Sequence, residues 1–152
     1  MGAEKSMDEF MKAALKQARI GAAEGGVPIG AALVRDGEIV ATGRNRRRQD
    51  DSIVMHAEMN CIHNAGKSMN FAEFAGTTLY STLMPCYMCA GAVLQFGIRK
   101  VVVGEAQTAN EGYDIMRQHG VEVIDLDLDE AKELLDEYFR ANPGNWTSHA
   151  TE

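Results

Sequence analysis

The stretch TTLYSTLMPCYMCAGAVL, residues 77–94, passes from a strand pattern directly into a helical one. β-Forming residues alternate over 77–83, and Pro85 then opens a short helix that we expect over 86–94. A strand followed at once by a helix predicts an α/β arrangement. Two further apolar runs, 101–103 and 121–124, predict short buried strands downstream of it.

Upstream, the sequence predicts a helix followed by a hairpin. Apolar residues at helical spacing indicate a first helix that begins at the capping-box pair Ser6 and Glu9 and ends at Gly25-Gly26. Strands are then expected over 29–34 and 38–42, on either side of the turn Asp36-Gly37.

Two more helices complete the pattern. One is expected over 55–63, and a helix face over 131–139 ends at Asn142-Pro143. Strands that alternate with helices after an initial hairpin predict a mixed sheet with helices on both faces. We expect residues 1–152 to form one domain.

Composition narrows the classes of partner. The chain has 152 residues, 45% of them hydrophobic and 24% charged, and a formal net charge of -7. An acidic chain is poorly suited to polyphosphates, so a nucleic-acid partner is disfavoured and a small molecule is expected. The sequence has neither a leader pattern nor an apolar run of membrane-spanning length, which predicts a soluble cytoplasmic protein without membrane contact.

The candidate chemistry lies in two short motifs, His56-Ala57-Glu58 and Pro85-Cys86-Tyr87-Met88-Cys89. Together they form the H-x-E…P-C-x-x-C pattern that is typical of zinc deaminases. Cysteines three apart share one helix face, and a helix N-terminus favours their thiolate forms. We therefore expect His56, Cys86 and Cys89 to bind one Zn²⁺, a better match than iron to this donor set. Three protein ligands leave a fourth position for water, which is typical of a catalytic site.

Glu58 is the expected proton shuttle between the attacking water, a ring nitrogen and the departing ammonia. Residues two apart on a regular helix point about 200° from each other. His56 must therefore lie at the first turn if Glu58 is to face the same site without binding the metal.

Several residues have plainer explanations. A lone C-x-x-C pair is also typical of redox motifs and of half a structural zinc site, and a structural site has no need of Glu58. Cys61 and His63 cannot reach the same metal, so we expect both to pack in the core. The basic run of Arg44, Arg46, Arg47 and Arg48 is expected to be a solvated loop, with phosphate or RNA binding as the alternative.

The chain resembles the cytidine-deaminase-like superfamily, and within it the fungal-type free-base cytosine deaminases. The resemblance extends over nearly the whole chain and rests on both motifs, on EGGVPIG at 24–30, GRN at 43–45, STLMPC at 81–86, VVGE at 102–105, and the late Trp146. It implies a three-layer α/β/α fold around a five-stranded mixed sheet, and a homodimer. It also implies that Asn45, the backbone at Ala57 and at Cys86, and Met84 contact the base, and that Trp146 closes the pocket.

Two departures from that family concern specificity. His149 stands where the cytosine enzymes have an acidic residue that contacts the pyrimidine, and Ala109 stands in place of a pocket phenylalanine. An anionic acceptor reads a ring N–H, whereas imidazole either donates or accepts. Cytosine is the expected substrate, and isocytosine, an aminotriazine or guanine are the alternatives.

A tRNA adenosine deaminase shares both motifs and the CAGA that ends the second, but the acidic charge of this chain disfavours it. A structural zinc module without turnover is the non-enzymatic alternative.

Overall fold

The computed structural model describes residues 2–144, with side chains described from residue 9 onward. Their elements run α1 (Gly2–Ala23), β1 (Gly30–Arg35), β2 (Glu38–Arg44), α2 (Ala57–Ala65), η1 (Phe71–Gly76), β3 (Thr77–Leu83), α3 (Tyr87–Gln95), β4 (Lys100–Glu105), α4 (Tyr113–Gln118), β5 (Glu122–Asp125) and α5 (Asp129–Ala141). Among these helices, none combines the length and the apolarity that crossing a lipid bilayer requires.

The five strands form one mixed sheet in the order β2-β1-β3-β4-β5. The hairpin partners β1 and β2 are antiparallel, and β1 also runs antiparallel to β3. Strands β3, β4 and β5 are parallel, because helices α3 and α4 return the chain to the same edge each time. The loops that leave the carboxyl ends of β3 and β4 therefore lie side by side.

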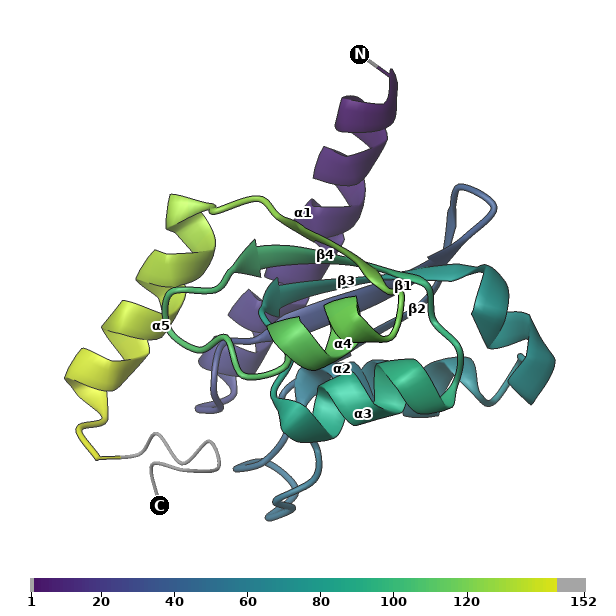
Figure 1. The fold of residues 1–152 in the computed structure, drawn as a ribbon. Helices are drawn as coiled ribbons and strands as arrows, with labels where there is room; N and C mark the ends of the chain where they lie inside the picture. Colours follow the sequence, from purple (N-terminus) through teal and green to yellow (C-terminus); the bar gives the residue numbers. More distant parts are fainter. Residues whose placement is uncertain (1, 145–152) are drawn as a thin grey trace.

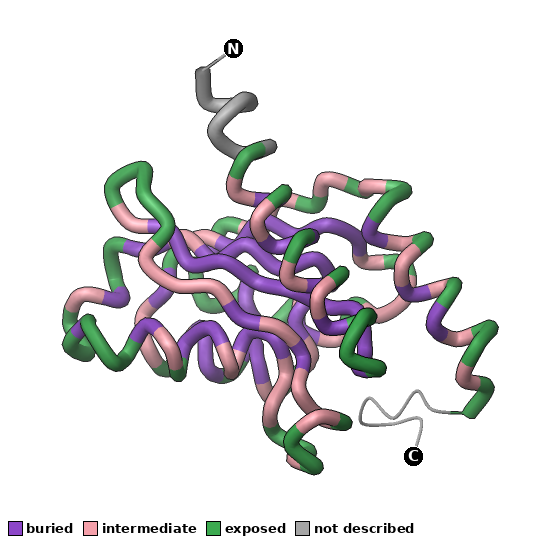
Figure 2. The backbone as a smooth tube through the Cα atoms, turned by 180° about the vertical axis from the view of Figure 1, so that it is seen from behind, coloured by how far each residue is buried: buried purple, intermediate pink, exposed green. Residues whose placement is uncertain are grey.

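Alternation along the strands divides the core into two layers. Leu33, Leu79 and Val101 pack with α2 and α3 on one face. Their neighbours in sequence, Val34, Tyr80 and Val102, pack with α1 and α5 on the other face. Figure 1 shows the resulting three layers, with α1 and α5 on one side of the sheet and α2, α3 and α4 on the other. In Figure 2 the buried residues follow the central strands. The predicted mixed five-stranded α/β/α sandwich is confirmed.

Close packing of α2 against the hairpin depends on a glycine. A Cβ at Gly43 would overlap the backbone nitrogen of Cys61 and lie 2.9 Å from the carbonyl oxygen of Ala57. The amide of Asn64 also donates to Thr42 at 2.9 Å. Strand β2 and the start of α2 are thus held together, and this fixes where Asn45 lies relative to His56.

The structure differs from the sequence prediction at three elements. Helix α1 begins at Gly2, so Ser6 lies within it and is not its N-cap. The short elements η1 and α4 were not predicted. Both have six residues, fewer than two helical turns, and such a length is too short for apolar periodicity to show.

Candidate active site

The candidate site forms where α2 and α3 begin. His56 is the N-cap of α2 and Cys86 is the N-cap of α3, both with extended backbone. Neither side chain forms the usual N-cap hydrogen bond with its own helix, and both side chains face the site. Two helix N-termini meet here, and their free N–H groups make the site electropositive. The position expected for His56, at the first turn, is confirmed.

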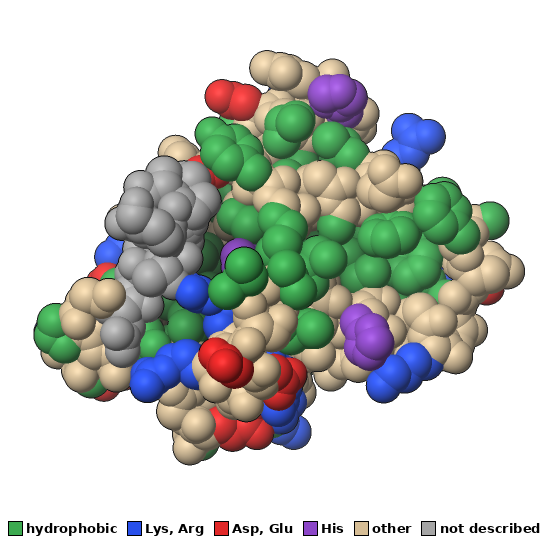
Figure 3. Space-filling view, turned by 90° about the horizontal axis from the view of Figure 1, so that it is seen from below, with side chains coloured by type: hydrophobic (Ala, Val, Ile, Leu, Met, Phe, Trp, Pro, Cys, Tyr) green, Lys and Arg blue, Asp and Glu red, His purple; other side chains and the backbone are tan. Residues whose placement is uncertain are grey.

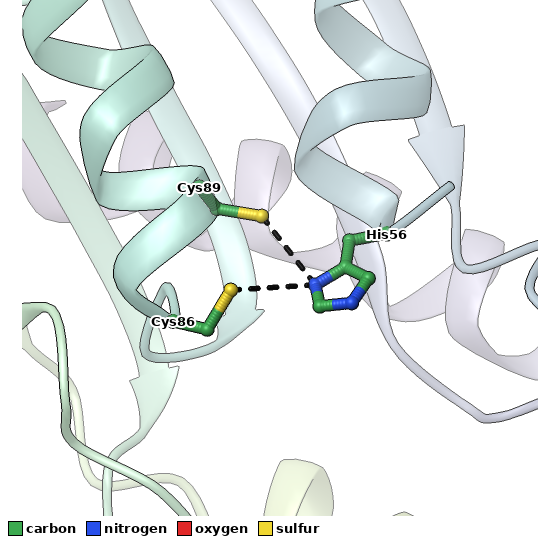
Figure 4. A group of neighbouring side chains, drawn as sticks. All are labelled: His56, Cys86 and Cys89. Carbon is green, nitrogen blue, oxygen red and sulfur yellow. Dashed lines mark hydrogen bonds between the residues drawn. The ribbon is translucent and has the colours of Figure 1, made fainter. Parts of the chain in front are cut away.

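The three candidate ligands come together from these two helices. The Nδ1 atom of His56 lies 3.5 Å from the sulfur of Cys86 and 3.5 Å from that of Cys89. The ligand atoms all lie within 4.8 Å of one another, and Figure 4 shows both cysteines of α3 pointing at the imidazole. A tetrahedral zinc with ordinary Zn–N and Zn–S lengths puts nitrogen and sulfur about 3.6 Å apart. The spacing and the soft donor set both fit zinc.

The electrostatics of this group also favour a cation. Hydrogen bonds from Cys89 and from His56 lower the pKa of the Cys86 thiol to about 4. The same shared hydrogen bond and burial raise the pKa of Cys89. Burial alone lowers the pKa of His56, but Cys86 and the charge of Glu58 outweigh it and the net direction is upward. The positive charge of a divalent cation relieves the repulsion between two sulfurs and a nearby carboxylate. Such a cation also deprotonates a coordinating thiol outright.

Glu58 lies in the first turn of α2 and is only 4% exposed. Its burial raises the carboxyl pKa to about 7, against the opposing effect of His56. Glu58 and His56 line one pocket, although they are only two residues apart. This is possible because His56 is the N-cap and has left the helical backbone, so the 200° separation expected within a helix does not apply.

The pocket opens beside the metal group. Its lining includes four apolar residues, Ile29, Leu83, Met84 and Ala109, and one buried amide, Asn45. The Oδ1 atom of Asn45 accepts from the backbone N–H of Arg47 at 3.0 Å, so the Nδ2 group is left to donate into the pocket. Met84, as expected, is part of the lining.

Two charged residues of the pocket were missed as site residues by the sequence analysis, Arg47 and Glu111. Arg47 had been grouped with the basic run, and Glu111 lies in the loop between β4 and α4, where periodicity is silent. The one available signal for Glu111 was the VVGE strand end, because residues just beyond the carboxyl ends of parallel strands commonly line ligand-binding sites.

The loop that carries Glu111 is fixed at both ends. At its start, Glu105 is fully buried, and its Oε1 atom accepts from the backbone N–H of Gln107 at 2.7 Å and of Thr108 at 2.9 Å. At its end, the N–H of Gly112 donates to the carbonyl of Pro85 at 3.0 Å. Glu111 is therefore held beside the turn that precedes Cys86.

The basic run lies at the surface, with residues 45–48 in the loop that follows β2, and most of its arginines also have partners within the chain. Arg44 forms two hydrogen bonds with Glu24, both 2.9 Å, and Arg46 forms two with Asp50, both 3.0 Å. Arg48 donates to Tyr138 at 3.2 Å. Three of the four arginines are thus occupied by partners within the chain, whereas Arg47 faces the pocket.

The remaining candidates lie elsewhere. Cys61 is fully buried, as expected, and burial raises the pKa of its thiol to about 12. The expectation of core packing was wrong for His63, which is exposed in the last turn of α2. Ala57 is buried as the first residue of α2. Trp146 and His149, together with the pocket closure expected of that tail, fall outside the described residues.

Comparison with known proteins assigns the class. Residues 4–105 match the family described as the cytidine and deoxycytidylate deaminase zinc-binding region. The chain belongs to this family. It is a zinc-dependent deaminase, a hydrolase, with the His/Cys/Cys zinc-binding site typical of its members.

Individual relatives differ in what they act on. A cytosine deaminase from Candida albicans is 34% identical over 143 residues, which is 93% of this chain and 95% of that protein. A tRNA-specific adenosine deaminase from Bacillus subtilis is 46% identical over 95 residues, 62% of this chain and 59% of that protein. A structure from a study of tRNA:A34 deaminases aligns with a TM-score of 0.74 and 32% identity over 84% of this chain and 99% of that one. A guanine deaminase from Nitrosomonas europaea, at a TM-score of 0.75 and 24% identity over 85% of this chain and 82% of that one, has the same fold.

Proposed function

We propose that this protein deaminates a free nucleobase, with cytosine converted to uracil and ammonia. The observation that carries the proposal is the shared pocket: two members of the metal group, His56 and Cys86, line it together with the buried carboxylate of Glu58 and the amide of Asn45. The Candida albicans cytosine deaminase, which matches this chain nearly end to end, supports cytosine as the substrate.

His56, Cys86 and Cys89 are the ligands in this proposal. Zinc bound there supplies Lewis-acid activation of water at neutral pH. The chain itself must hold the base, keep bulk water out and move protons. The apolar lining formed by Ile29, Leu83 and Met84 suits the faces of a flat ring.

Binding begins with the carbonyl of the base. The Nδ2 group of Asn45 donates to a carbonyl oxygen or other acceptor, because its Oδ1 is already used by Arg47. The backbone N–H groups of residues 57 and 86 belong to the N-terminal ends of α2 and α3, where such groups lack helical partners and bind oxygen well. These donors hold the base so that the amino-bearing carbon faces the metal group.

Glu58 handles the protons. The oxygen of water forms a bond to the amino-bearing carbon, and Glu58 takes a proton from that water. It gives this proton to the ring nitrogen beside the carbon. It then carries the second proton of the water, from the new hydroxyl group on that carbon, to the amino group as the C–N bond breaks and the C=O bond forms. The products are the oxo base and ammonia, so atoms balance without any other reactant. The burial of Glu58 keeps its protons from exchanging with bulk solvent.

Ammonia release by the zinc-loaded protein tests the proposal. Cytosine, isocytosine, guanine, ammeline, cytidine and adenosine would be compared at equal concentration. We expect the highest kcat/KM for cytosine and little for either nucleoside. Turnover of isocytosine, ammeline or guanine in preference to cytosine would instead favour the alternative base, and turnover of nucleosides alone would contradict free-base deamination.

The basic run argues against a tRNA substrate. Tight RNA binding needs Lys and Arg side chains that are free to neutralise phosphates. Here Arg44, Arg46 and Arg48 are engaged within the chain, and the net charge is -7. A gel shift with an anticodon-stem RNA is expected to give no specific complex.

We also propose that the protein is a homodimer. Figure 3 shows hydrophobic side chains gathered across the face seen from below, the side of the sheet on which α2 and α3 lie. Large apolar side chains that remain exposed include Ile53 at 80% and Tyr87 at 59%. Exposed apolar area of this kind is commonly covered by a partner. Light scattering coupled to gel filtration is expected to give twice the chain mass of 16.6 kDa.

A further inference from the structure

We propose that Glu111 reads a ring N–H of the substrate, so that it selects free bases over nucleosides. This inference rests on the proposed function. It also addresses the change at position 149, where His149 replaces an acidic residue of the cytosine enzymes, because the loop after β4 supplies a carboxylate to the pocket described above.

Apart from its carboxylates, the pocket offers the substrate mainly hydrogen-bond donors. Asn45 offers its Nδ2 group, Arg47 offers only donors, and the two helix N-termini add backbone N–H groups. These all suit the oxygen or unprotonated nitrogen of a base. They leave any N–H on the edge of the ring without a charged acceptor.

Two carboxylates line the pocket, Glu58 and Glu111. Glu58 follows the ligand His56 by two residues and is needed at the reacting carbon. Glu111 approaches from a different element, the loop between β4 and α4. A carboxylate has about four lone-pair positions, so Glu111 can accept an N–H from the base alongside its other contacts. Of the two carboxylates in the described lining, it is the one that the proton transfers do not use, so it can bind an N–H of the base.

The position of Glu111 is built into the fold. Glu105 anchors the start of the loop through two backbone N–H groups, and Gly112 anchors its end on Pro85. A Cβ at Gly112 would overlap that carbonyl oxygen, so only glycine permits this approach. A carboxylate on such a loop enters the pocket at a defined place, as a specificity residue must.

In cytosine the ring N–H in question is at N1, the atom that carries the sugar in a nucleoside. A carboxylate there favours the free base in two ways. It accepts the N1–H through a charge-assisted hydrogen bond, and it has no such partner when N1 carries a ribose. The structure thus gives one residue both the attraction and the exclusion.

The experiment compares Glu111→Gln with Glu122→Gln, a matched change at an exposed glutamate of β5. Each variant would be assayed on cytosine and on 1-methylcytosine, which has no N1–H. For Glu111→Gln we expect kcat/KM on cytosine to fall about 10- to 100-fold, mainly through KM, which is the range for a hydrogen bond to a charged group. The ratio of cytosine to 1-methylcytosine should fall by at least about tenfold. The zinc content of both variants should match that of the parent protein, and so should the kcat/KM values of Glu122→Gln.

A binding measurement separates this inference from the proposed function. Calorimetry with cytosine would use zinc-loaded Glu58→Ala protein, with and without Glu111→Gln, so that no turnover is needed. Weaker binding by about 10-fold or more in the double variant supports the inference even if no base is deaminated, an outcome that would overturn only the proposed function. Unchanged affinity, or an equal fall for cytosine and 1-methylcytosine, overturns the role of Glu111 whatever the activity.

Discussion

The two halves of the pocket are built differently. On the metal side, His56, Glu58, Cys86 and Cys89 all belong to the first turns of α2 and α3. On the other side, Asn45, Arg47 and Glu111 lie in loops that follow β2 and β4. Helix ends hold the groups that do the chemistry, and loops hold the groups that meet the rest of the substrate. Such a division lets specificity change while the chemistry is retained, and relatives that act on cytosine, adenosine in tRNA and guanine share this fold.

The largest expected effect is loss of the metal. In Cys89→Ala the ligand set loses a thiolate, so we expect zinc to fall from about one per chain to below about a tenth, and activity to fall about 10³-fold or more. Cys61→Ala is the control, since Cys61 is a buried cysteine outside the ligand group. Metal analysis of dialysed protein measures the difference. Equal zinc in Cys89→Ala and the parent would refute this ligand assignment.

Glu58→Gln is expected to separate chemistry from metal binding. The amide keeps the size of the side chain but cannot accept and return a proton, so kcat should fall about 10²- to 10⁴-fold while zinc is retained. Ammonia release and metal content would be measured on the same preparation. If kcat stayed within about threefold of the parent protein, the proton shuttle would have to be another group.

The metal half of the pocket was predictable because its signal is local. His56 and Glu58 are two apart and the cysteines three apart, and fixed spacing on a helix start translates directly into geometry. The strand and helix order was predictable for a similar reason, since β1 and β3 are short, nearly continuous buried runs and α5 has an apolar face at helical spacing.

The substrate half was harder to predict because it depends on tertiary contacts. Glu111 enters the pocket through the hydrogen bonds of Glu105 and the fit of Gly112 on Pro85, and neither leaves a periodic trace. The partners of the arginine run were hidden for the same reason, because Glu24 and Tyr138 contact it from distant parts of the chain, and only Asp50 lies in the same loop. Similarly, the exposure of His63 depends on which side of α2 faces the sheet.

A substitution at Gly112 tests whether the substrate half of the pocket, which Asn45, Arg47 and Glu111 form on loops, depends on close packing. In Gly112→Ala the new Cβ would overlap the carbonyl oxygen of Pro85 and lie 2.8 Å from the Cβ of Ala90. We expect a loss of about 1–3 kcal/mol in the free energy of unfolding, and a KM for cytosine raised about tenfold as Glu111 moves. Urea denaturation and steady-state kinetics measure the two effects.

Gly91→Ala is the matched control for that change. Gly91 lies inside α3, and a methyl group added there would have no neighbouring atom within 4 Å, so alanine should raise the free energy of unfolding by about 0.5–1 kcal/mol. Opposite signs for two Gly→Ala changes would tie the loop to its docking on Pro85. The same sign for both would mean that the loop adapts and that the fit at Gly112 is unimportant.

The smallest expected effect concerns the hydrogen bonds that Glu24 accepts from Arg44 and Gln49, on either side of Asn45 in the sequence. The side chains of Arg44 and Gln49 donate to Glu24 and lower its pKa from 4.5 to about 2. A carboxyl whose pKa is lower in the folded state stabilises the fold above its ordinary pKa, and that contribution is lost as pH falls toward the folded value. We therefore expect the parent protein to exceed Glu24→Gln in the free energy of unfolding by a constant amount above about pH 5.5, and by a decreasing amount between about pH 4.5 and about pH 2.

Urea denaturation at several pH values measures that difference. Because Glu24 is at the surface, salt should also reduce the difference, whereas salt should leave the effect of Gly112→Ala almost unchanged. A difference that held constant down to about pH 2 would mean that Glu24 acts through packing alone, and that charge does not hold the substrate half of the pocket.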